Sequence, residues 1–403
     1  MQLQHVPVRF SALASAALIL CSTGASAQVS AGASAILLGT LAKPSVEGRT
    51  LAEGYVSQPI AMIRAAAPKL HAAADVTLDL ERFTLERGEL NIGMYGEGYV
   101  DRRHPHTLLH EVVGTLGSRR ASLSIGKGFV PFGTDDPMSR PFVKYPINHH
   151  LSQILERAIV AGAVSSGPLV VEASLFNGDE PESPTDYPNW SRFGDSWSAR
   201  ATGRSKGIEA QISYAKVASP EEPSGGGLDT RKINTSLRYE AGDKYGLTEW
   251  ARTREYDRNA TAFILYSFLA EGALTRSRNV YSLRGEVTDR PEEERTTNLF
   301  RTPRPHSDLS ILGRTRWFGL TAGASTSFAR KRIKPFLEVA VHRPSSLVKN
   351  SAFDPEQFYG ANWLWSFSAG VRLGVGMLHQ RMGRYGAAVF QSMGHDMMDM
   401  EGM

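Results

Sequence analysis

Strict alternation of apolar and polar residues runs through several segments of this chain and constrains its fold more than any other feature. In residues 365–375, apolar side chains fall on one face and polar or small ones on the other. Residues 232–240, 281–288 and 337–342 alternate in the same way. Such alternation is typical of β-strands, because successive side chains of a strand point to opposite faces. The sequence therefore predicts an all-β fold.

The connections between the predicted strands alternate in length. The short ones are 117–120, 165–168, 204–207, 241–246, 275–279 and 329–334. The long ones are 131–156, 179–195, 218–229, 289–308 and 343–362. Short turns at one end and long loops at the other are typical of a transmembrane antiparallel up-and-down β-barrel. We therefore expect one such barrel of about 14 to 16 strands, an even number being the rule, over residues 70–390.

The first 27 residues have the pattern of a secretory signal peptide. Arg9 precedes an apolar run at 10–20, and small residues lead up to Ala27, after which we predict cleavage. The only cysteine, Cys21, lies in this segment, so the mature chain has no disulfide. Because the strands are counted from about residue 70, residues 28–69 are predicted to be a periplasmic or loosely ordered segment.

The polar faces of the clearest strands carry charges of both signs. A barrel of this size is too wide for side chains to fill, so its polar face would line a wet lumen. The predicted pore-lining residues are Lys232, Arg238, Glu240, Arg284, Glu286, Glu338 and Arg372. A lumen of mixed sign favours passive diffusion of small polar or charged solutes. The alternative is that these charges form the solvated outer face of a soluble protein.

The long connection 131–156 contains a short helical pattern that Asn148 is expected to cap. Connections of this length are often functional. One hypothesis is that this loop folds inward and narrows the pore, which would place His149 and His150 near the constriction. The other is that it forms a simple cap on the surface.

Two stretches resemble known protein families. Residues 124–133 (SIGKGFVPFG) and 156–179, two strands ending in Phe-Asn-Gly-Asp, resemble bacterial outer-membrane porin-like barrels. This resemblance implies an outer-membrane location, with membrane lipid, small solutes and the barrel-assembly machinery as partners and a homo-oligomer as a further option. No nucleic-acid partner is expected. Many porins end on an aromatic assembly signal, whereas here thirteen residues follow Phe390.

A narrower resemblance covers residues 96–111 (GEGYVDRRHPHTLLHE), which are similar to uncharacterised exported proteins of environmental bacteria. Some of these are associated with copper handling. His104, His106 and His110 share a parity in this stretch and would share a face of a strand. Imidazole suits Zn²⁺ and Cu²⁺. The favoured alternative is structural, a charge network of neighbouring Asp, Arg and Glu residues that fixes the loop.

The stretch is not a zinc-protease signature, which needs His-Glu-x-x-His on a helix, and no catalytic residue is predicted. A second metal hypothesis concerns the tail, residues 391–403. Thioether sulfur selects Cu(I), and short His- and Met-biased tracts are typical of metal binding. The tail would capture copper through Met393, His395, Met397, Met398, Met400 and Met403, or would be disordered without function. No cofactor is required for the barrel itself.

Three functions fit these observations. The favoured one is a passive outer-membrane channel for small solutes, with a link to copper through the tail. The second is an outer-membrane barrel enzyme, a lipid hydrolase or protease, which would need Ser, His and acid groups converging at the barrel rim. The third is a soluble exported β-protein that binds metal.

Overall fold

A computed structural model describes most of the chain beyond the predicted signal peptide. The described residues are 28–43, 50–85, 88–93, 102–103, 105–134, 137–293, 311–329, 332–348, 353–376 and 382–385. The predicted signal peptide 1–27 and the Met-rich tail 391–403 lie outside them.

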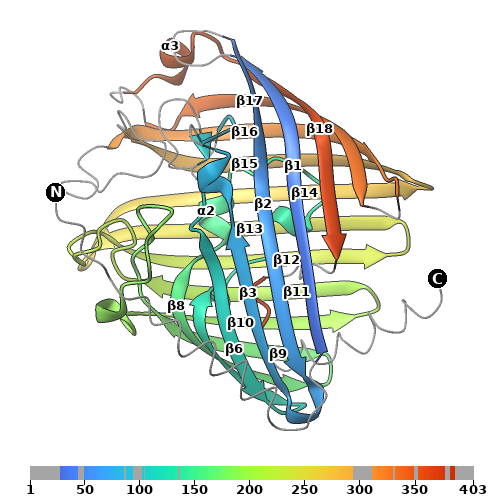
Figure 1. Ribbon diagram of the computed structural model, residues 1–403. Helices are drawn as coiled ribbons and strands as arrows, with labels where there is room; N and C mark the ends of the chain where they lie inside the picture. The colour runs from blue at the N-terminus through green and yellow to red at the C-terminus, as the bar shows by residue number, and fades with distance from the viewer. Residues whose placement is uncertain are drawn as a thin grey trace, which may run out of the picture.

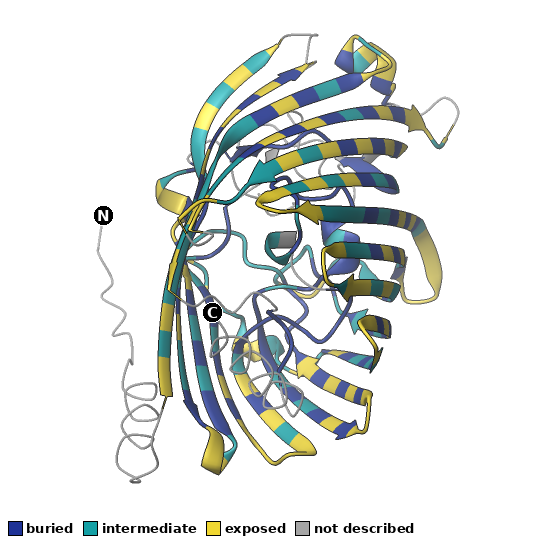
Figure 2. Ribbon diagram, turned by 90° about the vertical axis from the view of Figure 1, so that its right-hand side faces the viewer, coloured by how far each residue is buried: buried dark blue, intermediate teal, exposed yellow. Residues whose placement is uncertain are grey.

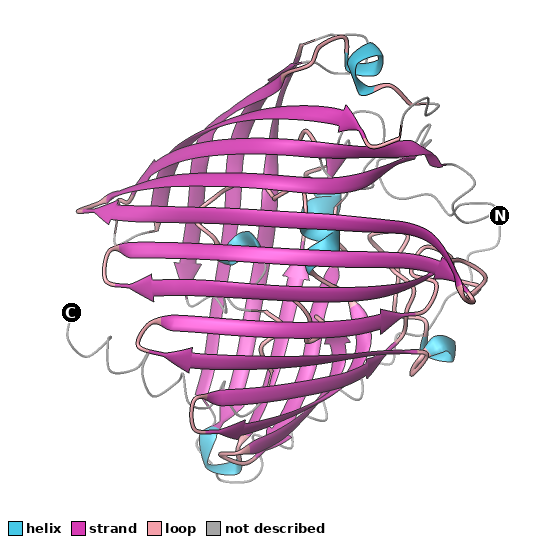
Figure 3. Ribbon diagram, turned by 180° about the vertical axis from the view of Figure 1, so that it is seen from behind, coloured by secondary structure: helices cyan, strands magenta, loops and turns pink. Residues whose placement is uncertain are grey.

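Sixteen antiparallel strands close into a single barrel, in which each strand pairs with its neighbours along the chain and β1 pairs with β18 (Figures 1 and 3). This confirms the predicted all-β up-and-down barrel of about 14 to 16 strands. The strands are β1 Gln28–Lys43, β2 Leu51–Ala67, β3 Ala72–Asp79, β6 Leu109–Gly117, β7 Ala121–Gly128, β8 Arg157–Ser166, β9 Leu169–Phe176, β10 Ser196–Ser205, β11 Ile208–Val217, β12 Asp229–Ala241, β13 Lys244–Asp257, β14 Ala260–Arg276, β15 Asn279–Glu293, β16 Ile311–Thr326, β17 Ile333–Ser346 and β18 Leu364–Gly376.

The remaining elements are short. A separate two-stranded sheet pairs β4 with β5, and the helical elements have three to five residues each. Their bounds are β4 Glu89–Leu90, β5 Arg102–Arg103, α2 His149–Ser152, α3 Pro355–Tyr359, η2 Pro68–Leu70, η3 Glu81–Phe83, η4 Pro137–Ser139 and η5 Trp190–Arg192. None of the helices in the described part of the chain is long and apolar enough to cross a membrane.

The barrel begins earlier in the chain than predicted. Residues 28–69, expected to be periplasmic or loosely ordered, contain β1 and β2, and the prediction was wrong. β1 pairs with β2 on one side and with β18 on the other, with Leu37 opposite Val371. Without these two strands, the edges of β3 and β18 would be left with unpaired backbone groups. The last strand in the described part of the chain, β18, ends at Gly376, and the predicted end of the barrel at residue 390 lies outside the described residues.

The polarity of the two faces of the barrel wall is the reverse of that in a soluble protein, with apolar side chains outside and polar ones inside. Leu283 and Phe367 point outward and are 56% and 39% exposed, whereas Arg284 and Glu286 point inward and are 2% and 3% exposed. Exposed and buried residues alternate along most strands (Figure 2). An apolar outer face with a polar inner face is the arrangement of a transmembrane barrel.

Candidate functional site

The long connection between β7 and β8, residues 129–156, lies inside the barrel and is called the inner segment below; residues 135 and 136 are outside the described part. Two wall carboxylates hold its backbone. The N–H groups of Val143 and Lys144 donate to the two oxygens of Glu338, at 2.8 and 3.1 Å, and the N–H of Ile147 donates to Glu286 at 2.7 Å. Of the two hypotheses for this loop, the structure shows the inward fold.

Three wall cations hold the carbonyl groups of the same segment. Arg284 donates to the carbonyl oxygen of Lys144 at 3.0 Å, and Arg372 donates to that of Phe142 at 3.2 Å. Lys232 donates to the carbonyl oxygen of His150 at 2.7 Å. Buried backbone groups need hydrogen-bond partners, and bonds to charged groups are the strong ones. Five of the seven predicted pore-lining residues therefore fix the inner segment in place.

The other two predicted pore-lining residues lie elsewhere. Arg238 and Glu240 are close to the end of β12, at the short-turn rim of the barrel. They form an ion pair of 2.9 Å with each other, and the Glu240 side chain is 62% exposed. The structure does not place them in the set that anchors the inner segment. That any of the seven lines a conducting pore stays a prediction.

Glu249 of β13 is a further anchor, which the sequence did not reveal. It accepts hydrogen bonds from Asn148, at 2.6 Å, and from the hydroxyl groups of Thr134 and Ser152. Asn148 precedes α2 as expected, but its side chain makes no capping hydrogen bond. The predicted capping role is therefore wrong, because Asn148 uses its amide to bind the buried carboxylate instead.

The two predicted constriction histidines have different surroundings. His149 is buried, and its ring lies 4.8 Å from the ring of Tyr145 and 6.4 Å from that of His106. His150 is half-buried, and its ring lies 5.3 Å from that of His149. The structure thus connects His149 to the histidine site described below. A role for either residue in limiting passage through the barrel stays a prediction.

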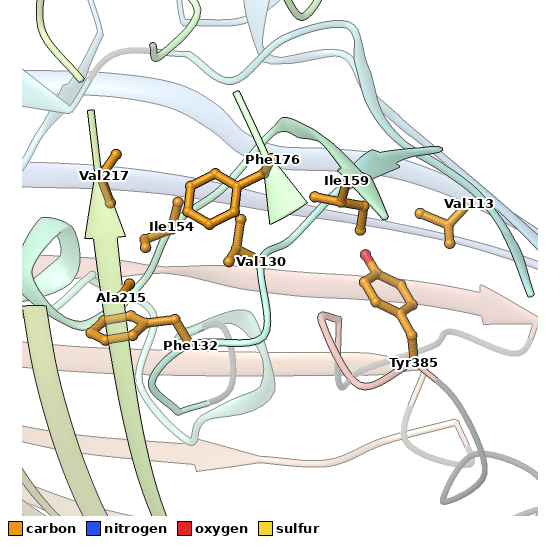
Figure 4. Packing of buried hydrophobic residues seen from close by; sticks show 9 residues of the cluster. All are labelled: Val113, Val130, Phe132, Ile154, Ile159, Phe176, Ala215, Val217 and Tyr385. Atoms are coloured by element: carbon orange, nitrogen blue, oxygen red, sulfur yellow. The ribbon is translucent and has the colours of Figure 1, made fainter. Parts of the chain in front are cut away.

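Apolar packing fixes the two ends of the inner segment against the wall. Val130, Phe132 and Ile154 pack with inward-facing wall residues that include Phe176, which is fully buried (Figure 4). The other members of this cluster are Val113, Ile159, Ala215, Val217 and Tyr385. The inner segment is therefore part of the packed interior.

A short piece of chain beyond the last strand, residues 382–385, also lies inside the barrel and is called the C-terminal insert below. The Tyr385 hydroxyl donates to Glu111 at 2.6 Å and accepts from the N–H of Phe129 at 3.0 Å. Arg384 pairs with Glu209 at 3.0 Å. Burial, together with the adjacent Glu111 carboxylate, raises the pKa of Tyr385 well above its usual value. The insert joins the inner segment to the wall.

A buried histidine–carboxylate site lies where β3 ends and β6 begins. His106 Nδ1 is 3.5 Å from Asp79 and 3.3 Å from Glu81. His110 Nδ1 is 2.6 Å from Glu156, the last residue of the inner segment. One potential ligand atom each from Asp79, His106 and His110 lies within 4.8 Å of the others. The chemistry of this donor set suits a divalent metal ion.

The local backbone explains how this site forms. The pairing of β3 with β6 shifts between Thr77–Glu111 and Leu78–Leu109, which leaves His110 as the extra residue of a bulge. Bulges re-aim side chains, and here both His110 and Glu111 are buried. The predicted shared strand face is therefore wrong for His106 and His110, since His106 precedes the strand and His110 is in the bulge. His104 lies outside the described residues.

Hydrogen bonds hold Glu156 against His110. The backbone N–H and the hydroxyl of Thr107 donate to Glu156 at 3.0 and 2.6 Å, and Lys127 donates to the Thr107 hydroxyl. Burial alone would raise the pKa of Glu156, but Lys127 and the hydrogen bond with His110 outweigh burial and hold that pKa well below its usual value. Glu156 is thus a carboxylate that keeps the His110 ring in one orientation.

Comparison with known proteins identifies the fold. No protein-family model and no curated protein matches this chain. Among solved structures, the anion-selective porin from Comamonas acidovorans aligns over 87% of this chain and 100% of its own, with 10% identity and a TM-score of 0.55. This is the porin fold. The trimer form of OmpT, an outer membrane protein of Vibrio cholerae, aligns over 87% and 99%, with 10% identity and a TM-score of 0.54.

Salmonella typhi OmpF, in complex with daunomycin, aligns with this porin-like barrel over 87% of this chain and 97% of its own, at 9% identity and a TM-score of 0.51. Likeness at this level of identity concerns the fold. The residues that sequence reasoning missed in the site are Asp79, Glu81 and Glu156. Their positions depend on barrel closure, which brings together residues that lie far apart in the sequence, and no local pattern marks them.

Proposed function

We propose that this protein is an outer-membrane channel of the porin type, through which small polar or charged solutes diffuse passively. The observation that carries the proposal is the inner segment, held across the lumen of a closed barrel by charged wall residues. A segment fixed in this way would narrow the passage between the two ends of the barrel, and a narrow passage in a wall that carries charges of both signs selects solutes by size and charge. On this proposal, the protein is a channel and not an enzyme.

The outer face supports a membrane location. Large apolar side chains such as Leu237, Phe268 and Leu337 are about half exposed around the barrel. Soluble monomers rarely expose so much contiguous apolar surface, so we infer that membrane lipid covers it. This argues against the soluble metal-binding alternative. By analogy with outer-membrane barrels, the end with the long connections faces the outside of the cell.

An acidic cleft at the long-loop end supports passage of cations in particular. Its walls include the carboxylates of Glu156, Asp179, Glu180, Glu182 and Asp186. Some of this charge is balanced, since Arg157 pairs with Glu180 and Arg192 lies 3.7 Å from Asp179. The remaining negative charge would raise the local concentration of cations at the mouth.

Single-channel conductance in a planar lipid bilayer tests this function. The mature chain should give steady open-channel current, and a variant lacking residues 140–152 should give a larger one because the lumen is cleared. A matched control lacks the exposed residues 224–226 of the loop between β11 and β12 and should conduct as the unmodified chain does. Protein that has inserted but passes no current would overturn the proposal.

The copper link of the tail, residues 391–403, is a separate proposal. Its sulfur and imidazole groups suit Cu(I). Competition against a Cu(I) chelator, comparing the full chain with one that ends at Gln391, tests it. Equal copper retention by the two chains would contradict this link while leaving the channel proposal intact. A homo-oligomer likewise stays a proposal, which the molecular mass of the detergent-solubilised protein would test.

A further inference from the structure

We propose that Asp79, His106 and His110 bind one divalent transition-metal ion, Zn²⁺ or Cu²⁺, inside the barrel near its long-loop end. This metal-site proposal does not depend on the proposed channel function, because the three residues lie together whether or not the lumen conducts. It also differs from the histidine set expected from the sequence, since it recruits a carboxylate from another strand.

The orientation of His110 is the first argument. Its Nδ1 is held by Glu156 at 2.6 Å, which leaves Nε2 on the other side of the ring. The residue is fully buried, and Nε2 has no hydrogen-bond partner among the residues that the structure describes. An unsatisfied buried polar atom costs about 1–3 kcal/mol, so such atoms call for an explanation. A metal ion bound at Nε2 supplies one.

The carboxylates around the two histidines also match known metal-site chemistry. Histidine ligands commonly bind metal through one ring nitrogen while a carboxylate holds the other, which fixes the ring and raises its basicity. Glu156 holds His110 in this way. On His106, Nδ1 lies between Asp79 and Glu81, at 3.5 and 3.3 Å. Two imidazoles and a carboxylate form a three-residue donor set that leaves a further position for water.

The spacing of the donor atoms is compatible with one ion after a small adjustment. The three ligand atoms lie within 4.8 Å of one another. A tetrahedral ion with bonds of about 2.0–2.2 Å sets its ligands roughly 3.3–3.6 Å apart. Side-chain rotations that move the ligand atoms by about 1 Å would therefore bring them to this spacing. The rings of His106 and His110 are already close, with centroids 4.8 Å apart.

The charge of the surroundings also favours a cation. Asp79, Glu81, Glu111 and Glu156 are all at most 4% exposed, and Lys127 brings a positive charge to the same network. Buried carboxylates that are ionised need compensating positive charge. A divalent ion would supply it at the point where Asp79 and the two histidines meet. The acidic cleft described above reaches Glu156, so it offers cations a route toward the site.

Zinc binding to the full-length protein in detergent tests the proposal, with bound Zn²⁺ counted by elemental analysis after gel filtration. The unmodified chain should retain one equivalent more than the His110→Gln variant, and the Asp79→Asn variant should bind at least tenfold more weakly. The matched control is His342→Gln. His342 is another buried inward histidine, whose Nδ1 has no partner in the described structure, but Arg284 and Arg290 lie near it. This control should bind zinc as the unmodified chain does.

A spectroscopic measurement makes the result independent of folding defects in a variant. Electron paramagnetic resonance of the unmodified chain with one equivalent of Cu²⁺ should show hyperfine coupling to two imidazole nitrogens. His110→Gln, once its heat-modifiable gel mobility shows a folded barrel, should show one. A copper spectrum of the unmodified chain without two-nitrogen coupling would overturn the proposal. So would equal zinc content in the His110→Gln and unmodified chains.

Discussion

Glu286 accepts a hydrogen bond of 2.7 Å from the backbone N–H of Ile147, a residue that lies 139 positions earlier in the chain. The bond connects a strand on one side of the barrel to a segment that crosses its interior. Water does not surround the Glu286 carboxylate, because the residue is only 3% exposed. The shape of the inner segment is therefore set by the wall that surrounds it, and changes to the wall should alter the position of this segment.

Replacing Glu286 with Ala should loosen the inner segment. The N–H of Ile147 would lose its acceptor, and a buried unsatisfied group costs about 1–3 kcal/mol. We expect the free energy of unfolding to fall by about this amount and the single-channel conductance to rise. Glu240→Ala is the control, because that carboxylate is 62% exposed and its surface ion pair contributes about 0–1 kcal/mol. Unchanged conductance in the Glu286 variant would argue against a constricting role for the segment.

Replacing Phe268 with Arg should distinguish a lipid-facing wall from a water-facing one. Phe268 lies at the middle of β14 and is 50% exposed. An arginine at the middle of the bilayer costs about 2–4 kcal/mol, and one near the interface costs about 0–1 kcal/mol. Urea unfolding in lipid vesicles should show the large loss for Phe268→Arg and the small one for Tyr281→Arg, close to the rim. If Phe268→Arg unfolds like the unmodified chain, water and not lipid covers this face.

Replacing Lys144 with Met should destabilise the protein over a wide pH range. Burial alone would lower the pKa of Lys144, but its 2.9 Å ion pair with Glu89 and its contact with Tyr55 outweigh burial and raise that pKa. A group with a raised folded-state pKa contributes its full stability below the unfolded pKa, which for lysine is about 10.4. The contribution is lost only as pH rises through the higher folded value.

Chemical unfolding from pH 6 to 11 measures this effect. Lys144→Met should lower the free energy of unfolding by about 3–5 kcal/mol up to pH 10, because it leaves Glu89 buried without its cation. The difference from the unmodified chain should shrink above that pH. Lys69→Met, at an exposed turn position, should change little. A difference that already disappears near pH 8 would show that Lys144 is not held in its charged form.

The sequence predicted the barrel because its main signals are local. The alternation along a strand such as β18 and the lengths of successive connections are both visible in the sequence, and neither requires knowledge of which strands pair. The predicted inward-facing side was right for Lys232, Arg284, Glu286, Glu338 and Arg372. These residues were expected to face water, however, and they bind the inner segment instead. That difference arises because the filling of the lumen depends on contacts between residues far apart in the chain.

The histidine site could be predicted only in part for the same reason. His106 and His110 are close in sequence, and their short spacing drew attention to them. Asp79 reaches them through the pairing of β3 with β6, and Glu156 through the return of the inner segment to the wall. The bulge at His110 also reverses the parity on which a sequence-based face assignment depends. Neither pairing register nor a bulge leaves a local pattern.

Removing the C-terminal insert should open the barrel from the short-turn end. β18 ends at Gly376, so a chain that stops there keeps all 16 barrel strands and loses residues 382–385. Arg200 would then lose the carbonyl of Gly383, which it binds at 2.6 Å, and Glu209 would lose Arg384. We expect a larger single-channel conductance and a lower free energy of unfolding than in the full chain.

A chain that ends at Gln391 is the matched control, because it lacks the Met-rich tail and retains the insert. It should conduct as the full chain does. If both truncated chains conduct as the full chain does, the insert does not limit the passage, and the constriction lies with the inner segment alone. If the Gln391 chain also gains conductance, the tail itself restricts the lumen. The two truncated chains differ by residues 377–391, which include the insert. Only a gain in conductance that is confined to the chain ending at Gly376 therefore assigns the restriction to these residues.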